Sequence, residues 1–151
     1  MTSNIDRIYM SEALKEAQKA FDTDEVPVGA IIVHNGRVVA KAHNQIKLLK
    51  DPTAHAEMIA ITQAAASCEN ERLPEAVLYV TIEPCPMCAG ALVLARIKRV
   101  CFGAPDPKTG AFGSQMDINK LKLNHKIAVT KGELEDECVF LMKEFFKKKR
   151  K

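Results

Sequence analysis

The chain has 151 residues, 47% of them hydrophobic, and a formal net charge of +3 at pH 7. That length and apolar fraction fit one domain with a real core, so residues 1–151 are predicted to form a single domain. The longest uncharged apolar runs are far shorter than the ~20 residues that cross a bilayer, and the first six residues lack the pattern of a secretory signal. We therefore expect a cytoplasmic protein without a membrane partner.

The first half of the chain predicts a helix and a hairpin. Apolar residues recur at helical spacing between Met10 and Phe21, which indicates an amphipathic first helix. The apolar runs 28–33 and 38–42 are joined at Asn35-Gly36, the strongest short signal of a β-hairpin. The sheet is therefore expected to begin with an antiparallel pair.

The second half alternates between helices and strands. The patterning predicts a helix from His55 to about Ser67, a strand at 77–82, a helix opened by Cys85, a strand at 99–103, and a last helix with apolar residues from Leu134 to Phe145. Two strand-helix-strand units imply that their strands pair in parallel. The hairpin adds an antiparallel pair at the start of the sheet. The expected fold is α/β: a mixed sheet of about five strands with helices on both faces, in three α/β/α layers.

Two short motifs carry the chemistry. Cys85 and Cys88 are three apart at the start of a helix, so both sulfur atoms can clamp one ion, and Pro86 suits the first helical turn. His55 supplies a third candidate ligand. A zinc site with three protein ligands leaves the fourth position to water, whereas structural zinc sites normally fill all four. The motifs therefore predict hydrolysis at a zinc site.

Glu57 follows His55 by two residues and has a different predicted task. On a regular helix, residues two apart point about 200° away from each other. We therefore expect the imidazole of His55 to bind the zinc and the carboxylate of Glu57 to act on the bound water.

Each motif also has an ordinary interpretation. Thr53 and Glu57 fit a plain helix start, with a capping hydroxyl and an acid in the first turn. Cys85 and Cys88, between a strand and a helix, fit a thioredoxin-like redox pair. A redox dithiol gives no reason for the His55 motif, so the two motifs together favour zinc. The cysteines expected to be buried, unpaired thiols are Cys68, Cys101 and Cys138.

Positive charge is concentrated at the C-terminal end. Residues 143–151 carry a net charge of +5, whereas the remainder of the chain carries −2. A basic helix end beside Phe145 and Phe146 suits a phosphate backbone with stacked bases. The alternative is a solvated, frayed tail.

The metal motifs place the chain beside a known family. His55-Ala-Glu57 with Pro84-Cys85-x-x-Cys88 resembles the signature of the zinc nucleobase and nucleoside deaminases. Nearly the whole chain resembles, more narrowly, the bacterial tRNA adenosine deaminases. The stretches that carry this closer resemblance are 25–30, 51–57, 83–90 and 102–111.

The resemblance implies a cytidine-deaminase-like fold and a defined reaction. Adenosine at the wobble position of a tRNA anticodon, expected to be that of an arginine tRNA, is hydrolysed to inosine with release of ammonia. One zinc ion per subunit activates the water that attacks adenine C6, and Glu57 shuttles the protons. The family also implies a homodimer that binds the tRNA anticodon stem-loop.

The substrate contacts are implied by the same resemblance. Asn44 is expected to hydrogen-bond the target base. The strand Val26 to Ala30, with Val28 among its residues, is expected to wall the pocket, and Gly29 to allow close approach. The further candidate RNA contacts are Asp106, Lys108 and Thr109, together with Phe145 and Phe146 of the basic end. Alternatively, Asn44 is simply a turn residue at the end of a strand. Ordinary turn chemistry explains the residue types of 105–110 almost as well as RNA contact does.

Three rival functions remain open at this point. A deaminase of a free base or nucleoside (guanine, cytidine or adenosine) would share the zinc chemistry but would not need a basic, aromatic C-terminus. A catalytically silent RNA-binding subunit would have no need of Glu57 as a proton shuttle. A thiol redox protein would form a reversible disulfide between Cys85 and Cys88 and would bind no metal.

Overall fold

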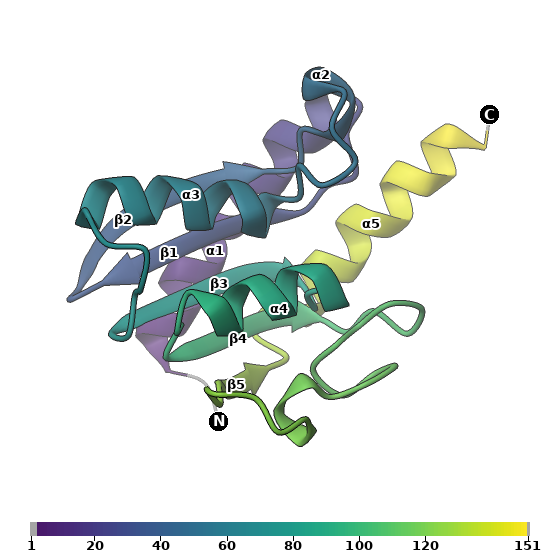
Figure 1. Cartoon of the computed structure of the whole chain (residues 1–151). Coiled ribbons are helices and arrows are strands. Elements are labelled where there is room, and N and C mark those ends of the chain that lie inside the picture. The colour runs from purple at the N-terminus through teal and green to yellow at the C-terminus, as the bar shows by residue number, and fades with distance from the viewer. Residues whose placement is uncertain (1–2, 151) are drawn as a thin grey trace.

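A single five-stranded sheet organises the computed structural model, which describes residues 3–150. Its strand order is β2-β1-β3-β4-β5, with helices on both faces (Figure 1). The strands are β1 (Gly29–His34), β2 (Arg37–His43), β3 (Ala76–Ile82), β4 (Arg99–Ala104) and β5 (Ala128–Lys131). The predicted α/β class, mixed sheet and three layers are confirmed.

The helices form the two outer layers. The helices are α1 (Asn4–Asp22), α2 (Ile46–Leu49), α3 (Ala56–Cys68), α4 (Pro86–Leu94) and α5 (Glu135–Lys149), with a 3₁₀ turn, η1 (Ile118–Lys120). In Figure 1, α3 and α4 lie in front of the sheet and α1 lies behind it. On that rear side α1 contacts β1 and β3, and α5 contacts β4. The short α2 and η1 were not predicted, because four and three residues are too few for a periodic pattern.

The hairpin forms as predicted. Asn35 and Gly36 both have positive φ values, of 51° and 76°, which the tight turn between two twisted strands requires. β1 and β2 pair in an antiparallel register, with an irregularity between Ile32 and Val33.

The parallel pairing is confirmed for only one of the two strand-helix-strand units. β3 and β4 are adjacent and parallel, as expected for a strand-helix-strand crossover through α4. β2 and β3 run in the same direction but do not pair, because β1 lies between them and is antiparallel to both. The fifth strand, β5, pairs in parallel with β4 and was not predicted, since its four residues are mostly exposed and lack an apolar pattern.

The core lies between the sheet and its two helical layers. The largest fully buried side chains include Ile31, Leu78 and Phe102, one from each of three neighbouring strands. None of Cys68, Cys101 and Cys138 forms a disulfide, as predicted, and Cys101 and Cys138 are buried as expected. Cys68 is only half-buried, so the predicted burial is wrong for this residue. Within residues 3–150, no helix combines the length and apolar character needed to span a membrane.

A buried charge network fastens the first helix to the sheet. Ser3 caps α1 by accepting a hydrogen bond from the backbone N–H of Asp6. The Asp6 carboxylate is 5% exposed and accepts hydrogen bonds from Tyr79 Oη at 2.7 Å and from Arg99 Nη2 at 2.8 Å. Burial opposes ionisation of Asp6, but these hydrogen bonds and the charge of Arg99 outweigh it and lower its pKa.

Replacing Asp6 should give a pH-dependent loss of stability. Because the folded-state pKa is below the unfolded one, the contribution of the ionised Asp6 is present above about pH 4 and is lost as the pH falls through the folded-state value. Asp6→Asn should lower the free energy of unfolding by about 2 kcal/mol at pH 7, and the difference should become smaller as the pH falls below about 4.

Urea unfolding at pH 7, 5 and 3 measures this difference. Asp22→Asn, which changes an exposed carboxylate of the same helix, serves as the control and should have little effect at any of the three. A loss for Asp6→Asn that is as large at pH 3 as at pH 7 would contradict the charge argument.

Candidate metal centre and active site

The His55 motif begins the helix α3 rather than lying within it. His55 is the N-cap residue, with extended backbone angles (φ −71°, ψ 151°), and Glu57 lies in the first turn. The angular argument for a regular helix therefore does not apply to this pair. Both side chains line one cavity, so the pair can still divide the tasks predicted for it.

The cysteine pair begins α4 in the same manner. Cys85 is its N-cap residue and Pro86 its first helical residue, and Cys88 is buried in the first turn. The His55 Nδ1 atom lies 3.6 Å from Cys85 Sγ and 3.4 Å from Cys88 Sγ. The two helix starts thus bring the three predicted ligands together, with their ligand atoms within 4.8 Å of one another.

The spacing of these atoms fits a tetrahedral metal ion. Zinc–nitrogen and zinc–sulfur bonds of the usual lengths at a tetrahedral angle would separate nitrogen from sulfur by about 3.6 Å. The two observed separations, 3.6 and 3.4 Å, match that edge. The group can therefore hold a metal with three protein ligands and one open position.

The electrostatics of the group favour a bound cation. Hydrogen bonds that the sulfur of Cys85 accepts from Cys88 and from His55 lower the pKa of Cys85 to about 4, although burial opposes this. The hydrogen bond with Cys85 and burial raise the pKa of Cys88. Both cysteines lie at the positive end of α4, where a thiolate is stabilised.

Glu57 is the buried acid of the site. Its side chain is 4% exposed, and burial raises its pKa to about 7. A carboxyl group in this environment can exchange protons near neutral pH.

Two of the three predicted ligands, His55 and Cys85, line a cavity of about 220 Å³ together with Glu57. Its lining residues are Val26, Val28, Asn44, Ile46, His55, Glu57, Ile82, Glu83, Cys85, Asp106 and Met142. Val28 and Asn44 therefore lie where the sequence placed them. Ile46, Ile82, Glu83 and Met142 were not predicted, because they come from three separate segments and no local motif connects them.

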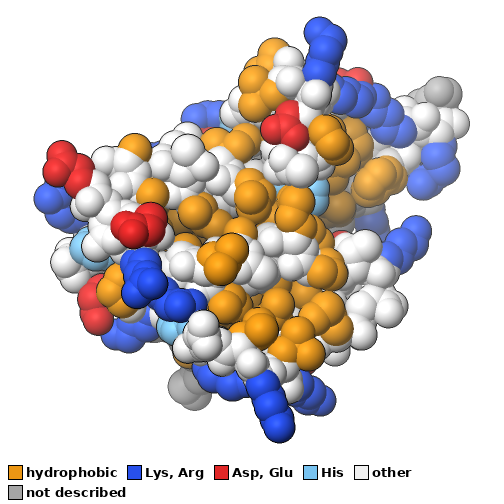
Figure 2. Space-filling view, in the orientation of Figure 1, with side chains coloured by type: hydrophobic (Ala, Val, Ile, Leu, Met, Phe, Trp, Pro, Cys, Tyr) orange, Lys and Arg blue, Asp and Glu red, His pale blue; other side chains and the backbone are white. Residues whose placement is uncertain are grey.

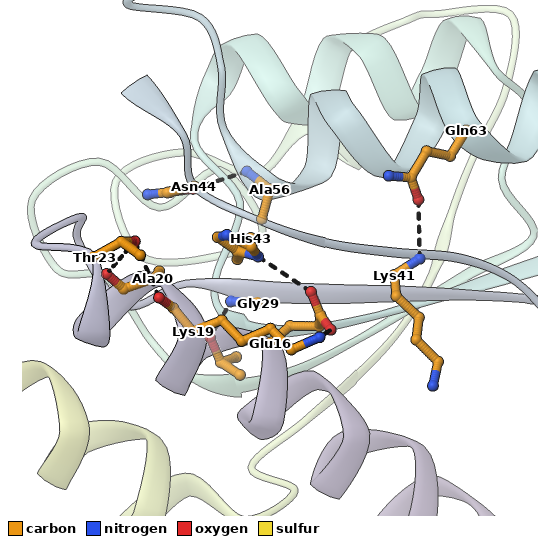
Figure 3. A network of polar contacts seen from close by, with 11 residues as sticks. Glu16, Lys19, Ala20, Thr23, Gly29, Lys41, His43, Asn44, Ala56 and Gln63 are labelled. Carbon is orange, nitrogen blue, oxygen red and sulfur yellow. Dashed lines mark hydrogen bonds and ion pairs between the residues drawn. The ribbon is translucent and has the colours of Figure 1, made fainter. Parts of the chain in front are cut away.

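Asn44 is held in one orientation by the helix that carries Glu57. Its Oδ1 atom accepts a hydrogen bond of 2.8 Å from the backbone N–H of Ala56, the first residue of α3 (Figure 3). Because Oδ1 is occupied by this bond, the amide nitrogen of Asn44 remains as a hydrogen-bond donor, and Asn44 lines the cavity. The neighbouring His43 is fixed to α1 through Glu16, 3.2 Å away.

Gly29 has a structural task instead of the predicted place in the pocket wall. A Cβ atom at position 29 would lie 2.0 Å from the carbonyl oxygen of Ala13 and 2.5 Å from the nitrogen of Ala17. Gly29 does not line the cavity; it lets the backbone of α1 approach the sheet.

The three candidate RNA contacts in the loop after β4 have different surroundings. Asp106 lines the cavity and also an adjoining groove of about 510 Å³, which Lys108 lines as well. Thr109 lines neither, and its hydroxyl donates to Asp106 Oδ2 at 2.7 Å. The backbone N–H groups of Lys108 and Thr109 also donate to Asp106, so turn chemistry accounts for Thr109.

The two aromatic residues of α5 face different surroundings. Phe145 is 3% exposed and packs against Phe21 of α1, so in this arrangement it offers no face to an RNA base. Phe146 is 43% exposed and lines the groove. Adjacent helical residues point about 100° apart, which explains why only one of the pair reaches the groove.

The basic end is helical as far as Lys149 and is attached to the body. Lys149 pairs with Asp24, and Lys148 lies 5.1 Å from the ring centroid of Phe21. The interpretation of a frayed tail therefore does not hold for residues 143–149, whereas Lys151 lies outside the described residues.

Comparison with known proteins decides the family. The chain matches the MafB19-like deaminase family over residues 4–150. It is 48% identical over 147 residues to a tRNA-specific adenosine deaminase of Bacillus subtilis, covering 97% of this chain and 91% of that protein. The chain belongs to this deaminase family. The resemblance stated from the sequence is thereby confirmed.

Solved structures agree with the family assignment. A structure from studies of A-to-I editing by tRNA:A34 deaminases at the wobble position has a TM-score of 0.83 and 43% identity, covering 89% of this chain and 98% of that chain. A guanine deaminase structure from Bacillus subtilis has a TM-score of 0.63 and 27% identity, over 82% of this chain and 88% of that chain. The deaminase therefore shares its fold most fully with the first of these two.

Removal of one ligand should abolish tight metal binding. Mutation of a residue that only hydrogen-bonds a metal ligand typically weakens metal binding by 10- to 100-fold. Cys88→Ser changes a ligand itself and should therefore weaken binding by about 100-fold or more. Competition with a chromogenic chelator measures the affinity. Cys68→Ser, which changes a thiol outside the triad, should leave it unchanged; equal losses in both variants would contradict the assignment.

Proposed function

We propose that this deaminase converts adenosine to inosine at the wobble position of a tRNA anticodon, with an arginine tRNA as the expected substrate. One observation carries the proposal: His55 and Cys85 of the three-residue metal group line the same cavity as the buried carboxylate of Glu57, and this cavity adjoins a groove lined by Lys108 and Phe146. The sequence relationship to the tRNA-specific adenosine deaminase of Bacillus subtilis supports this substrate.

We propose Zn²⁺ as the metal, with one ion per subunit. One nitrogen and two sulfur ligands form a set that suits zinc, and three protein ligands are typical of catalytic rather than structural sites. When bound, zinc supplies Lewis acidity that lowers the pKa of a water ligand. His55, Cys85 and Cys88 would hold it.

Glu57 would move the protons of the reaction. Its carboxylate takes a proton from the attacking water and delivers it to N1 of adenine as the water oxygen bonds to C6. The second proton of that water then goes to the exocyclic nitrogen, the C6–N6 bond breaks, and ammonia leaves. Water and adenosine thus give inosine and ammonia, and Glu57 ends in the state in which it began.

Asn44 and three apolar side chains would hold the base. The orientation imposed by Ala56 leaves the Asn44 amide nitrogen as a donor to a ring nitrogen or ribose oxygen. Val28, Ile82 and Met142 line the cavity and would contact the faces of the purine. The polar group fixes the orientation of the base, and the apolar groups exclude water.

The adjoining groove suits the nucleotides next to the target. It shares Ile82, Asp106 and Met142 with the cavity, so a strand could pass directly from one to the other. Lys108 and the exposed ring of Phe146 offer a charge for phosphate and a face for stacking. This continuity favours RNA over a free base or nucleoside, the alternative substrate class.

Deamination of an unmodified arginine tRNA anticodon stem-loop tests the function. The zinc-loaded protein should produce inosine at the wobble position and should not release ammonia from free adenosine, cytidine or guanine. Glu57→Gln should retain zinc and lose about 10²- to 10⁴-fold in turnover, because the proton shuttle is removed. Glu75→Gln, an exposed acid, should behave like the wild type. Ammonia from a free base alone would replace the RNA function by the alternative.

We also propose that the protein acts as a cytoplasmic homodimer. α4 contains no charged residue, and Leu94 at its end is 76% exposed. Figure 2 shows hydrophobic side chains gathered over α4, on the face of the molecule opposite α1. Leu121 and Leu123, which follow the 3₁₀ turn that contacts α4, are 46% and 42% exposed. An apolar surface of this kind favours association with a second copy.

The cytoplasmic location is supported by the cysteines. Their unpaired thiols suit a reducing compartment.

A charge placed on this surface should prevent dimer formation. Leu94→Lys should convert a dimer into a monomer in analytical ultracentrifugation, because the ammonium group would be buried without a partner. Phe140→Lys changes a side chain that is 64% exposed on α5, behind the sheet, and should leave the dimer intact. A wild-type monomer, or a Leu94→Lys dimer, would contradict the proposed interface.

A further inference from the structure

Glu83 is a buried acid at the site for which the proposed reaction has no use. It lies between the end of β3 and the ligand Cys85, and it is 3% exposed. We propose that Glu83 is a positioning residue: it holds the loop 105–114 against the mouth of the cavity and thereby sets the affinity for RNA without taking part in the chemistry. The RNA part of this inference depends on the proposed function.

The Glu83 carboxylate accepts four hydrogen bonds, all from that loop. Oε1 accepts from the backbone N–H of Asp106 at 3.0 Å and from the Ser114 hydroxyl at 2.5 Å. Oε2 accepts from the backbone N–H of Phe112 at 2.9 Å and of Ser114 at 3.2 Å. One side chain therefore ties together both ends of a nine-residue span, 106–114.

Gly110 shows how closely the loop surrounds this carboxylate. A Cβ atom at position 110 would lie 2.2 Å from Glu83 Cδ, so any other residue would displace the acid or the loop. Ala111, the next residue, donates its N–H to the carbonyl oxygen of Pro84 at 2.9 Å. The loop is thus held on the segment that leads into the metal ligand Cys85.

The held loop contributes side chains to both hollows of the candidate site. Asp106, whose N–H binds Glu83, lines the cavity and the groove, and Lys108 lines the groove. The loop has backbone hydrogen bonds of its own, among them that from Gly110 to Asp106, but the N–H groups of Asp106, Phe112 and Ser114 donate to Glu83 instead. Its position consequently depends on the acceptors that Glu83 provides.

This arrangement predicts an effect on binding rather than on turnover. A loop that is not ordered beforehand must be ordered when RNA binds, and that cost is subtracted from the affinity. The groups that act on the reacting atoms, Glu57 and the metal ligands, are held by the starts of α3 and α4 and not by this loop. The cost of ordering the loop is therefore the same for the bound substrate and for the transition state. Loss of the anchor should therefore raise KM and leave kcat unchanged.

Glutamine cannot replace the acid at this position. Each carboxylate oxygen accepts from a backbone N–H group, of Asp106 on one side and of Phe112 and Ser114 on the other. Either orientation of an amide would set its NH₂ group against one of these donors and leave that N–H unpaired. Glu83→Gln is therefore a nearly isosteric variant that removes the anchor.

The experiment measures KM and kcat of Glu83→Gln on the anticodon stem-loop, with zinc content and amide hydrogen exchange in parallel. We expect KM to rise about tenfold, kcat to stay within about twofold, and zinc to be retained. The amides of Phe112 and Ser114 should exchange faster than in the wild type. Asp6→Asn removes an equally buried charge away from the loop and should change neither KM nor these amides.

Ser114→Ala provides a milder variant should Glu83→Gln lose its zinc or its fold. It removes one of the four hydrogen bonds and should raise KM about threefold with kcat unchanged. An unchanged KM in folded, zinc-loaded variants, or a fall in kcat without a change in KM, would overturn the proposal. A wild-type protein that yields no inosine would refute the proposed function instead, and amide exchange would still test the anchor.

Discussion

The meeting of two helix starts at one end of the sheet is the constraint on which the rest of the site depends. His55 and Cys85 are the N-cap residues of α3 and α4, and the parallel pairing of β3 with β4 fixes where α4 begins. Because His55 and Cys85 lie at the junction between irregular and helical backbone, the position of each is set by the helix that follows it. The positive helix ends favour the anionic ligands, and Glu57 and Cys88 are placed by the first turn of each helix.

Buried carboxylates hold the irregular segments around this rigid centre. Glu83 holds the loop after β4, and Glu25, which is 3% exposed, accepts hydrogen bonds from the backbone N–H groups of Lys47 and Leu48 in α2. The segment with α2 supplies Ile46 to the cavity, and the loop after β4 supplies Asp106. A site that must admit a flexible RNA strand thus has walls that are irregular in backbone but fixed in position, which lowers the entropic cost of binding.

The features predicted from sequence are those that short segments encode. The two ligand motifs, the hairpin turn at Asn35-Gly36 and the α/β class follow from the sequence pattern. The structure brings His55, Cys85 and Cys88 together and shows the hairpin and the fold class. The insertion of β1 between β2 and β3 could not be predicted, because pairing between distant segments leaves no local pattern. The packing role of Gly29 depends on how α1 lies against the sheet, and the burial of Phe145 depends on Phe21 of α1, which lies far away in the sequence. Glu83 carries no signature as an anchor, since its partners lie 23 to 31 residues further along the chain.

X-ray absorption at the zinc edge of the purified protein tests the central claim most directly, because it reports the ligand atoms themselves. The account predicts two sulfur ligands at about 2.3 Å and two nitrogen or oxygen ligands at about 2.0–2.1 Å, for His55 and a water. Four sulfur ligands, a shell of light atoms alone, or a protein that holds no zinc would contradict it. Four sulfur ligands would leave no open position for water, and the other two outcomes would show that Cys85 and Cys88 do not hold a zinc ion.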